Sequence, residues 1–316
     1  MELELVGSYP RPYGLNEYIK KFRSGKIGSE ELDKAVGIYT QRLFGRLREM
    51  GFSYITDGMF RYDDIVDTVY YMVRGVEKGE LIRFYDNNFY YRKPVIKARI
   101  QPDVEAYVEN LKKSKQFLPK DSSLKLKAYA LGPLSLYELC DNRYYEDPVE
   151  MIFDYMKVLR DLSARLSGIV DALELHEPSF FMRTIPRTIR SRVGEIYSQL
   201  SDLKLRKSLL SYFSSDTTML PEFFKAEVDF HGIDVVSFKQ KLAQVYGYVR
   251  SKNLILGLID SRNTKLERTS LIKRVVFRMK EKGASSIVLS NNAPMDFIPE
   301  VVALRKLSIL AKFRGG

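Results

Sequence analysis

The stretch Lys125-Leu-Lys-Ala-Tyr-Ala-Leu131 begins the part of the sequence that decides the fold class. An amphipathic stretch over Val149–Leu166 follows it, and then a second apolar run, Ile169-Val-Asp-Ala-Leu-Glu-Leu175. Short apolar runs bounded by turn residues are typical of buried strands, and longer stretches with apolar residues at helical spacing are typical of helices that cover a sheet. The pattern therefore predicts two parallel strands joined by a crossover helix.

The same alternation continues in both directions along the chain. The other predicted strands are Leu3–Gly7, Phe52–Thr56, Leu209–Phe213, Ile233–Val236, Leu254–Leu258 and Ser286–Leu289. The other predicted helices are Ser29 to about Met50 with Ser29 as N-cap, Pro186–Lys204, Ser237–Lys252, Ser270–Lys282 and Pro299–Lys312. Eight repeats favour an α/β fold with a single TIM (β/α)8 barrel over residues 1–316. A doubly wound open sheet is the alternative, but no G-x-G-x-x-G sequence follows any predicted strand.

Residues 60–103 interrupt the alternation between the second and third predicted strands. The segment is rich in Tyr, Phe, Asn and Arg. An insertion after a barrel strand leaves from the carboxyl-terminal face, where barrel sites are built. We therefore expect Phe84–Tyr91 to fold over that face, with Arg83 within reach of Arg11 and Lys20. The alternative is a packed aromatic hairpin that only covers the barrel mouth.

Composition narrows the class of protein. With 316 residues, 45% of them hydrophobic and 29% charged, the chain is expected to be globular and without long disorder. No apolar run reaches the roughly 18 residues of a membrane span, and the start lacks the features of a secretory signal. The lone Cys140 excludes an internal disulfide, so we expect a cytoplasmic protein. Many Lys, Arg and Glu with few Gln and no Trp suggest a thermophile.

The balance of 51 basic and 40 acidic residues gives a net charge of +11. This excess raises the local concentration of anionic partners, whether nucleic acid or a small polyanion, and it also serves solubility alone. Two basic clusters stand out, Arg183, Arg187, Arg190 and Arg192, and Lys273, Arg274, Arg278, Lys280 and Lys282. The second alternates with apolar residues as in an ordinary amphipathic helix, which argues against nucleic-acid binding.

Eight phrases occur in the order in which a known family has similar ones. They are Val6-Gly-Ser-Tyr-Pro-Arg11, Asp57-Gly-Met-Phe-Arg-Tyr-Asp-Asp-Ile-Val-Asp67, Phe84-Tyr-Asp-Asn-Asn-Phe-Tyr-Tyr91, Gly132-Pro-Leu-Ser135, Glu174-Leu-His-Glu-Pro178, Ser211-Tyr-Phe213, Gly257-Leu-Ile-Asp-Ser-Arg-Asn-Thr264 and Pro299-Glu-Val-Val-Ala-Leu-Arg-Lys306. By these phrases the chain resembles the cobalamin-independent methionine synthase family from Val6 to about Lys312. The family enzyme has two related (β/α)8 barrels, and this chain has the length of one.

The resemblance favours the amino-terminal barrel, which carries no zinc. Phe84–Tyr91 is similar to the W-F-D-T-N-Y-H-Y phrase of that half, and Tyr212-Phe213 to its T-Y-F-G-D phrase. The tail Pro299–Lys306 is nearer to the carboxy-terminal, catalytic barrel.

The zinc ligands of the catalytic barrel are missing from this sequence. The family holds zinc with a His-x-Cys pair, a Glu and a later Cys, and the metal makes the homocysteine sulfur a thiolate. By resemblance the later Cys falls on Ala293, and the His-x-Cys pair falls around Ser211–Phe213. The sequence has one Cys and two His, His176 and His231. We therefore expect no zinc, and no catalysis by the chain alone.

The homocysteine site is altered as well. Two carboxylates of the family hold the homocysteine ammonium, and their positions are taken here by Met59 and His176. The turn Gly7-Ser8, which matches the family's carboxylate-binding turn, persists, although it is also readable as a plain strand-end turn. His176 is either a core histidine or a catalytic one. The resemblance predicts pocket positions at Gly7, Ser8, His176, Glu177 and Asp260.

A site for a methyl carrier remains. The amino-terminal barrel of the family meets the polyglutamate tail of methylfolate with basic residues, which fall loosely on Lys20 and on Arg83. The resemblance thus implies a cationic mouth that binds methyl-tetrahydrofolate or a related methyl-pterin; the alternative is a set of solvated surface cations. The substrate-binding residues would be Arg11, Lys20, Lys21, Arg83, Phe84, Asp86 and Asn88. Asp63, Asp64 and Asp67 would hold a cation or substrate, or pair with Arg61 or Arg74.

Three hypotheses follow. In the first, the chain is a companion barrel without zinc that binds the carrier and acts with a separate catalytic methionine synthase barrel in methionine biosynthesis. In the second, it is an autonomous methyltransferase of the same superfamily with another acceptor, using His176 or Glu177 in new roles. In the third, it is a structural or nucleic-acid-binding barrel, supported only by the charge. Neither a cofactor beyond the carrier nor a membrane is implied.

Overall fold

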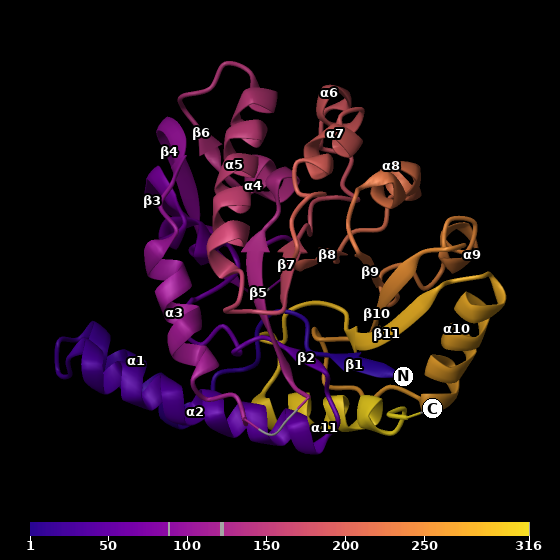
Figure 1. Cartoon of the computed structure of the whole chain (residues 1–316), viewed down its shortest axis with the longest axis horizontal. Helices are drawn as coiled ribbons and strands as arrows, with labels where there is room; N and C mark the ends of the chain where they lie inside the picture. The colour runs from indigo at the N-terminus through magenta and orange to yellow at the C-terminus, as the bar shows by residue number, and fades with distance from the viewer. Residues whose placement is uncertain (88, 121–122, 316) are drawn as a thin grey trace.

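The computed structural model describes residues 1–87, 89–120 and 123–315 and shows a closed parallel barrel (Figure 1). Its strands, in their order around the barrel, are β1 (Glu2–Glu4), β11 (Ser286–Asn291), β10 (Asn253–Ile259), β9 (Phe230–Asp234), β8 (Arg206–Ser211), β7 (Ala172–His176), β5 (Lys125–Leu131) and β2 (Tyr54–Ile55). This confirms the predicted TIM barrel and excludes the open sheet, because β1 pairs in parallel with both β2 and β11.

Strand β5 shows why these sequences form buried strands. Both of its faces are covered after the exposed Lys125, since one face meets the helices and the other fills the barrel. Lys127 points inward, where its ammonium group pairs with Glu4 of β1. By the two-residue period of a strand, Leu126 and Ala128 face outward to the helices. The barrel interior is therefore partly ionic at this level.

Helices surround the barrel. Those that match the predicted ones are α2 (Ser29–Glu49), α5 (Pro148–Leu166), α10 (Thr269–Glu281) and α11 (Glu300–Ala311). Those that sequence patterns did not single out are α1 (Tyr13–Arg23), α3 (Glu105–Lys115), α4 (Pro133–Leu139) and α8 (Leu220–Lys225), with short 3-10 turns η1 (Val66–Tyr71) and η2 (Thr217–Met219). Ser29 is the first residue of α2 and not its N-cap, which is Gly28 in an extended conformation.

Two predicted helices are much shorter than expected. The stretch 186–204 divides into α6 (Arg187–Arg190) and α7 (Val193–Ser198), because Arg192 leaves helical geometry between them. The stretch 237–252 keeps only α9 (Leu242–Val245). There the Asp234 carboxylate accepts hydrogen bonds from the backbone N–H groups of Val236 and Ser237, which fixes a turn directly after β9 and delays the helix.

The inserted segment forms an antiparallel hairpin of β3 (Val73–Arg83) and β4 (Tyr90–Pro102), to which the short β6 (Asp141–Asn142) adds. Figure 1 shows the hairpin standing beside α5 at the edge of the barrel. An ion pair of 2.8 Å between Arg99 of β4 and Asp154 of α5 joins the two. Within the described residues, no helix is both long enough and apolar enough to cross a membrane.

Candidate functional site at the barrel mouth

The tip of the β3–β4 hairpin covers the carboxyl-terminal end of the barrel. The Phe84 ring meets Phe213, which follows β8, at 6.2 Å between ring centroids, and Phe89 meets Phe297, which follows β11, at 5.4 Å. The Tyr85 hydroxyl hydrogen-bonds Ser179 after β7 at 2.5 Å. The insertion is thus a packed hairpin and also a cover over the face on which barrel enzymes build their sites. Asn88 lies outside the described residues.

Beneath one side of this cover lies a cavity of about 620 Å³. Its lining residues come from the hairpin tip and from the ends of β10 and β11, and they are Arg83, Asp86, Asn87, Phe89, Asp260, Arg262, Asp296 and Phe297. Three predicted site residues, Arg83, Asp86 and Asp260, are brought together here. The cavity combines aromatic walls with guanidinium groups, a combination suited to a flat ring that carries negative charge.

The two arginines of the cavity are oriented by contacts at its edge. Arg83 donates from Nε to the Asn87 carbonyl at 2.8 Å and lies 3.5 Å from the Asp86 carboxylate. Arg262 lies 3.8 Å from Asp260, and its guanidinium stands 5.0 Å from the centroid of the Phe213 ring. A guanidinium has five N–H groups, so contacts of this kind leave it able to meet an anionic ligand as well.

Asp296 connects the cavity to the end of β1. The Ser8 hydroxyl donates to the Asp296 carboxylate, and the backbone N–H of Met295 donates to the Ser8 carbonyl at 3.1 Å. Burial raises the pKa of Asp296 to about 6, against the opposing effects of the Ser8 hydrogen bond and the Arg11 charge. Ser8 is therefore engaged by the protein itself, and Asp296 titrates close to neutrality at the cavity wall.

Gly7 occupies the tightest turn below the mouth. It has a φ of +65°, and a Cβ atom there would lie 2.8 Å from Pro294 Cγ and 3.1 Å from His176 Cε1. Its backbone N–H donates to the Glu174 carboxylate at 2.7 Å. The turn that in the resemblance would bind a substrate carboxylate is thus filled by a carboxylate of the protein.

His176 and Glu177 are completely buried. The His176 ring bonds Tyr212 through Nδ1 and Glu174 through Nε2, both at 3.0 Å. Glu177 accepts from the backbone N–H groups of Leu134 and Ser135, at 2.9 and 2.7 Å, and from the Ser135 and Tyr197 hydroxyls. Burial raises the pKa of Glu177 to about 7. Both side chains hold the fold together, so the core interpretation of His176 is favoured over the catalytic one.

An ionic cluster lies deeper in the barrel. Lys127 pairs with Glu4 at 3.2 Å and with Glu174 at 2.7 Å, and Arg206 also reaches Glu4. Burial alone would raise the pKa of Glu174, but the Lys127 charge and the His176 hydrogen bond outweigh it and lower this pKa to about 2. The charged groups of this cluster are thus paired with one another.

The remaining predicted cations lie around α1. Arg11 pairs with Asp63 at 3.0 Å, and Arg23 reaches the same carboxylate at 2.6 Å. Lys20 is largely exposed and pairs with Glu17 at 2.8 Å, while Lys21 stands over the Tyr18 ring. Arg11 is linked to the cavity by its electrostatic effect on Asp296.

The acidic run Asp63, Asp64 and Asp67 pairs with other partners than expected. Asp67 binds Lys78 at 2.7 Å, and Asp64 accepts from the backbone N–H of Asp67. The two expected partners are used elsewhere, because Arg61 pairs with Asp33 and Arg74 with Asp103. In the described ranges, no group of three or more His, Cys, Asp or Glu side chains is arranged to hold a metal ion.

The residues do not fit the zinc site of the family's catalytic barrel. Ala293, at the position of the later Cys, is fully buried. His176 already uses both ring nitrogens, and burial lowers the pKa of His231, which packs against Phe223 and Phe224, to about 4. Burial also raises the pKa of Cys140 to about 12, so its thiol stays protonated. The two histidine rings and the cysteine thiol are thus buried in different places and do not form a zinc site.

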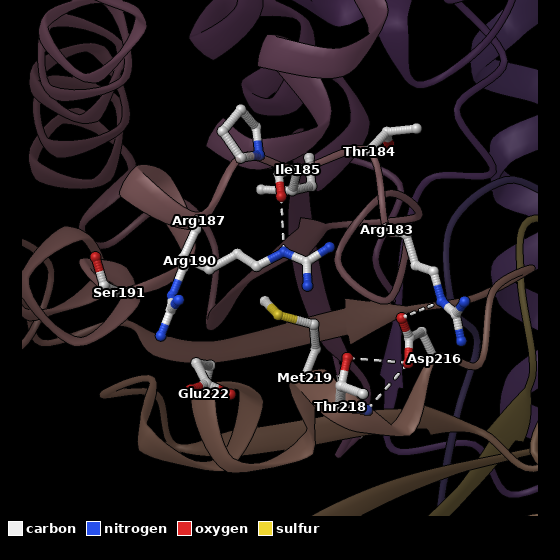
Figure 2. A pocket seen from close by; sticks show the side chains of 11 residues that line it. Arg183, Thr184, Ile185, Arg187, Arg190, Ser191, Asp216, Thr218, Met219 and Glu222 are labelled. Carbon is white, nitrogen blue, oxygen red and sulfur yellow. Dashed lines mark hydrogen bonds and ion pairs between the residues drawn. The ribbon is translucent and has the colours of Figure 1, made fainter.

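A second cavity, of about 800 Å³, contains three of the four clustered arginines (Figure 2). Arg183 pairs with Asp216 at 3.0 Å, and Arg190 donates to the backbone carbonyls of Ile185 and Met182. Figure 2 shows Arg187 pointing to the side of the opening where Glu222 lies. With Asp216 and Glu222 in its wall, this cavity carries less positive charge than the sequence cluster suggested.

Sequence reasoning missed Arg262, Asp296, Phe213 and Phe297 as lining or closing residues of the mouth. Phe213 ends a predicted strand, and the other three lie within eight residues after the end of one. Position near the carboxyl end of a strand was the available signal in a barrel. Phe213 also has an unusual φ of +71°, which turns the chain sharply at the end of β8. The partners that make these residues a site come from distant parts of the chain.

Comparison with known proteins gives one family match. The description "Cobalamin-independent synthase, N-terminal domain" matches residues 59–282. A methionine synthase of Sulfolobus acidocaldarius is 23% identical over 310 residues, which cover 98% of this chain and 89% of that protein. A methionine synthase of Saccharolobus solfataricus is 23% identical over 284 residues, covering 88% of this chain and 82% of that protein.

Solved structures share the fold. A B12-independent methionine synthase from a Shewanella species, in complex with selenomethionine, has a TM-score of 0.78 and 16% identity and covers 98% of this chain and 96% of its own. A putative vitamin-B12 independent methionine synthase from Listeria monocytogenes has a TM-score of 0.77 and 18% identity, with coverage of 100% and 98%.

Proposed function

The chain belongs to the cobalamin-independent methionine synthase family, and from this premise we propose that it is a companion barrel without zinc in methionine biosynthesis. It would bind methyl-tetrahydrofolate or a related methyl-pterin at the mouth and act with a separate catalytic barrel. The observation that carries the proposal is the mouth cavity, where Phe89 and Phe297 lie beside Arg83 and Arg262. Aromatic faces suit a pterin ring, and guanidinium groups suit the carboxylates of its tail.

The residues inside the barrel support the view that this chain binds the carrier and that another barrel carries out the methyl transfer. Methyl transfer to homocysteine requires a thiolate, and only a few per cent of a free thiol is ionised at neutral pH. The positions that would hold zinc and the homocysteine ammonium carry Ala293, Met59 and His176, all of them buried. The same burial argues against an autonomous methyltransferase that would use His176 or Glu177, because both are used in internal hydrogen bonds.

The proposal is tested by two measurements on the full chain. Calorimetric titration with the triglutamate form of methyl-tetrahydropteroate should show binding, while an uncharged pterin should bind more weakly. Methionine formation should be absent with the chain alone and should increase when the chain is added to the zinc-bearing barrel from the same genome. Turnover by the chain alone, or about one zinc per chain in tag-free protein, would contradict the proposal.

A further inference from the structure

An apolar groove of about 670 Å³ runs along α10 on the side of α9. Leu242 and Tyr246 line it from the segment after β9, and Leu266, Leu271 and Val275 line it from the β10–α10 connection and α10. The groove lies where the sequence predicted a long helix over 237–252. The structure has only the one-turn helix α9 there, which leaves this side of α10 less covered. Leu266 and Leu271 consequently stay 55% and 45% exposed. Large exposed aliphatic side chains that line one groove mark an interaction surface.

The edge of the groove carries several basic side chains. Its cations are Lys239, Lys265, Arg268, Arg274 and Arg278. The two carboxylates of the groove are already used, since Glu267 pairs with Lys306 at 2.6 Å and Asp260 accepts from the Asn263 amide. Of the five cations, only Arg278 has an ion-pair partner among the residues that the structure describes, and that partner is Glu281 on its own helix.

The groove adjoins the candidate site. Asp260 lines both the groove and the mouth cavity, so the two are neighbours. The connection from Asp260 to α10 forms a wall of each. A segment bound in the groove would therefore lie directly beside a ligand bound at the mouth.

We propose that this groove binds an acidic amphipathic helix of the separate catalytic barrel. The inference rests on the proposed function, because it needs that partner. α10 has 13 residues and is therefore about 20 Å long, enough for a helix of roughly three turns to lie along it. Apolar side chains of such a helix, three or four residues apart, would fit between Leu242 and Leu271. Acidic residues on its flanks would meet the basic side chains at the edge of the groove. Charge complementarity of this kind sets register and speeds association.

The test measures affinity between the full chain and the zinc-bearing methionine synthase barrel from the same genome, with matched variants on one helix. Leu271→Asp alters a groove residue that is 45% exposed, and Phe277→Asp alters an apolar residue of α10 outside the groove that is 65% exposed. Arg274→Glu and Lys273→Glu form the corresponding pair for charge. We expect Leu271→Asp and Arg274→Glu to raise Kd at least tenfold, and each control to change it less than threefold, with all four melting temperatures close to that of the wild type.

Several outcomes would overturn the inference. Equal effects of test and control variants would mean that the groove is not the docking surface, while increased methionine formation by the mixture would leave the proposed function standing. Self-association of the wild type that Leu271→Asp abolishes would assign the groove to a second copy of this chain. If carrier binding, association and turnover are all missing, the proposed function fails together with the inference.

Discussion

Two levels of the same barrel end differ in how their polar groups are used. At the lower level, which we call the floor, Glu174, His176 and Glu177 are completely buried and bonded to other parts of the protein. At the upper level, the rim, Arg83, Arg262 and Asp296 border a cavity of about 620 Å³. Position at the carboxyl end of a barrel strand thus identifies where a site lies, but only the neighbours decide whether a side chain can bind a ligand.

The largest expected effect is on the floor. Lys127→Met would leave the carboxylates of Glu4 and Glu174 buried beside each other with less compensating charge. Breaking a buried pair in this way costs about 3–5 kcal/mol of unfolding free energy. Urea denaturation should show that loss, whereas Lys125→Met on the same strand, with an exposed side chain, should cost less than about 1 kcal/mol. Similar losses for both would mean that the ionic cluster is not what stabilises the floor.

A smaller loss of unfolding free energy is expected at Gly7, in the turn between the floor and the rim. Gly7→Ala places a methyl group against Pro294 and His176 at a positive φ, and should cost about 2–3 kcal/mol. Gly25 has a φ of +70°, and a Cβ atom added there would meet nothing within 4 Å, so Gly25→Ala isolates the conformational cost, about 1 kcal/mol. Thermal unfolding of the two variants separates crowding from backbone strain, and a Gly7→Ala loss no larger than that of Gly25→Ala would show that the turn has room.

The sequence predicts the barrel because its signals are local. Apolar runs and helical periodicity lie within single elements, and the order of the elements leaves few closures. The prediction of a helix over 237–252 was wrong because the Asp234 carboxylate accepts a hydrogen bond from the backbone N–H of Val236. The helical spacing of apolar residues does not reveal this contact. The residue types at the mouth were partly predictable from strand ends. Their partners were not, since Ser8 bonds Asp296 across almost the whole chain and Gly7 bonds Glu174.

At the rim, charge reversal should affect ligand binding and leave stability nearly unchanged. Arg83→Glu should weaken a polyglutamylated carrier more than a monoglutamate one, because the longer tail has more carboxylates near this position. The Arg83 side chain is 49% exposed, so the loss should be about 1 kcal/mol, roughly a fivefold rise in Kd. Arg92→Glu, on β4 of the same hairpin, is the control for net charge. Equal weakening of both carriers would place the tail elsewhere.

The smallest expected effect concerns pH. Asp296 has a pKa raised to about 6, so the folded protein holds its proton more tightly than the unfolded chain does. The stability that comes from this proton is present below the ordinary pKa near 4 and is lost as the pH rises through 6. Deprotonation also adds a negative charge to the cavity wall beside an anionic ligand.

Binding of a glutamate-bearing carrier should therefore be two- to fivefold tighter at pH 5 than at pH 7.5, a difference of about 0.5–1 kcal/mol. Asp296→Asn removes the titrating group while keeping an acceptor for the Ser8 hydroxyl, and its affinity should vary less between these pH values. Calorimetric titration of both proteins gives the comparison, with any titration of the ligand common to the two. A pH dependence that Asp296→Asn leaves unchanged would assign the effect to the ligand or to another carboxylate, and Asp296 would then belong with the floor and not with the rim.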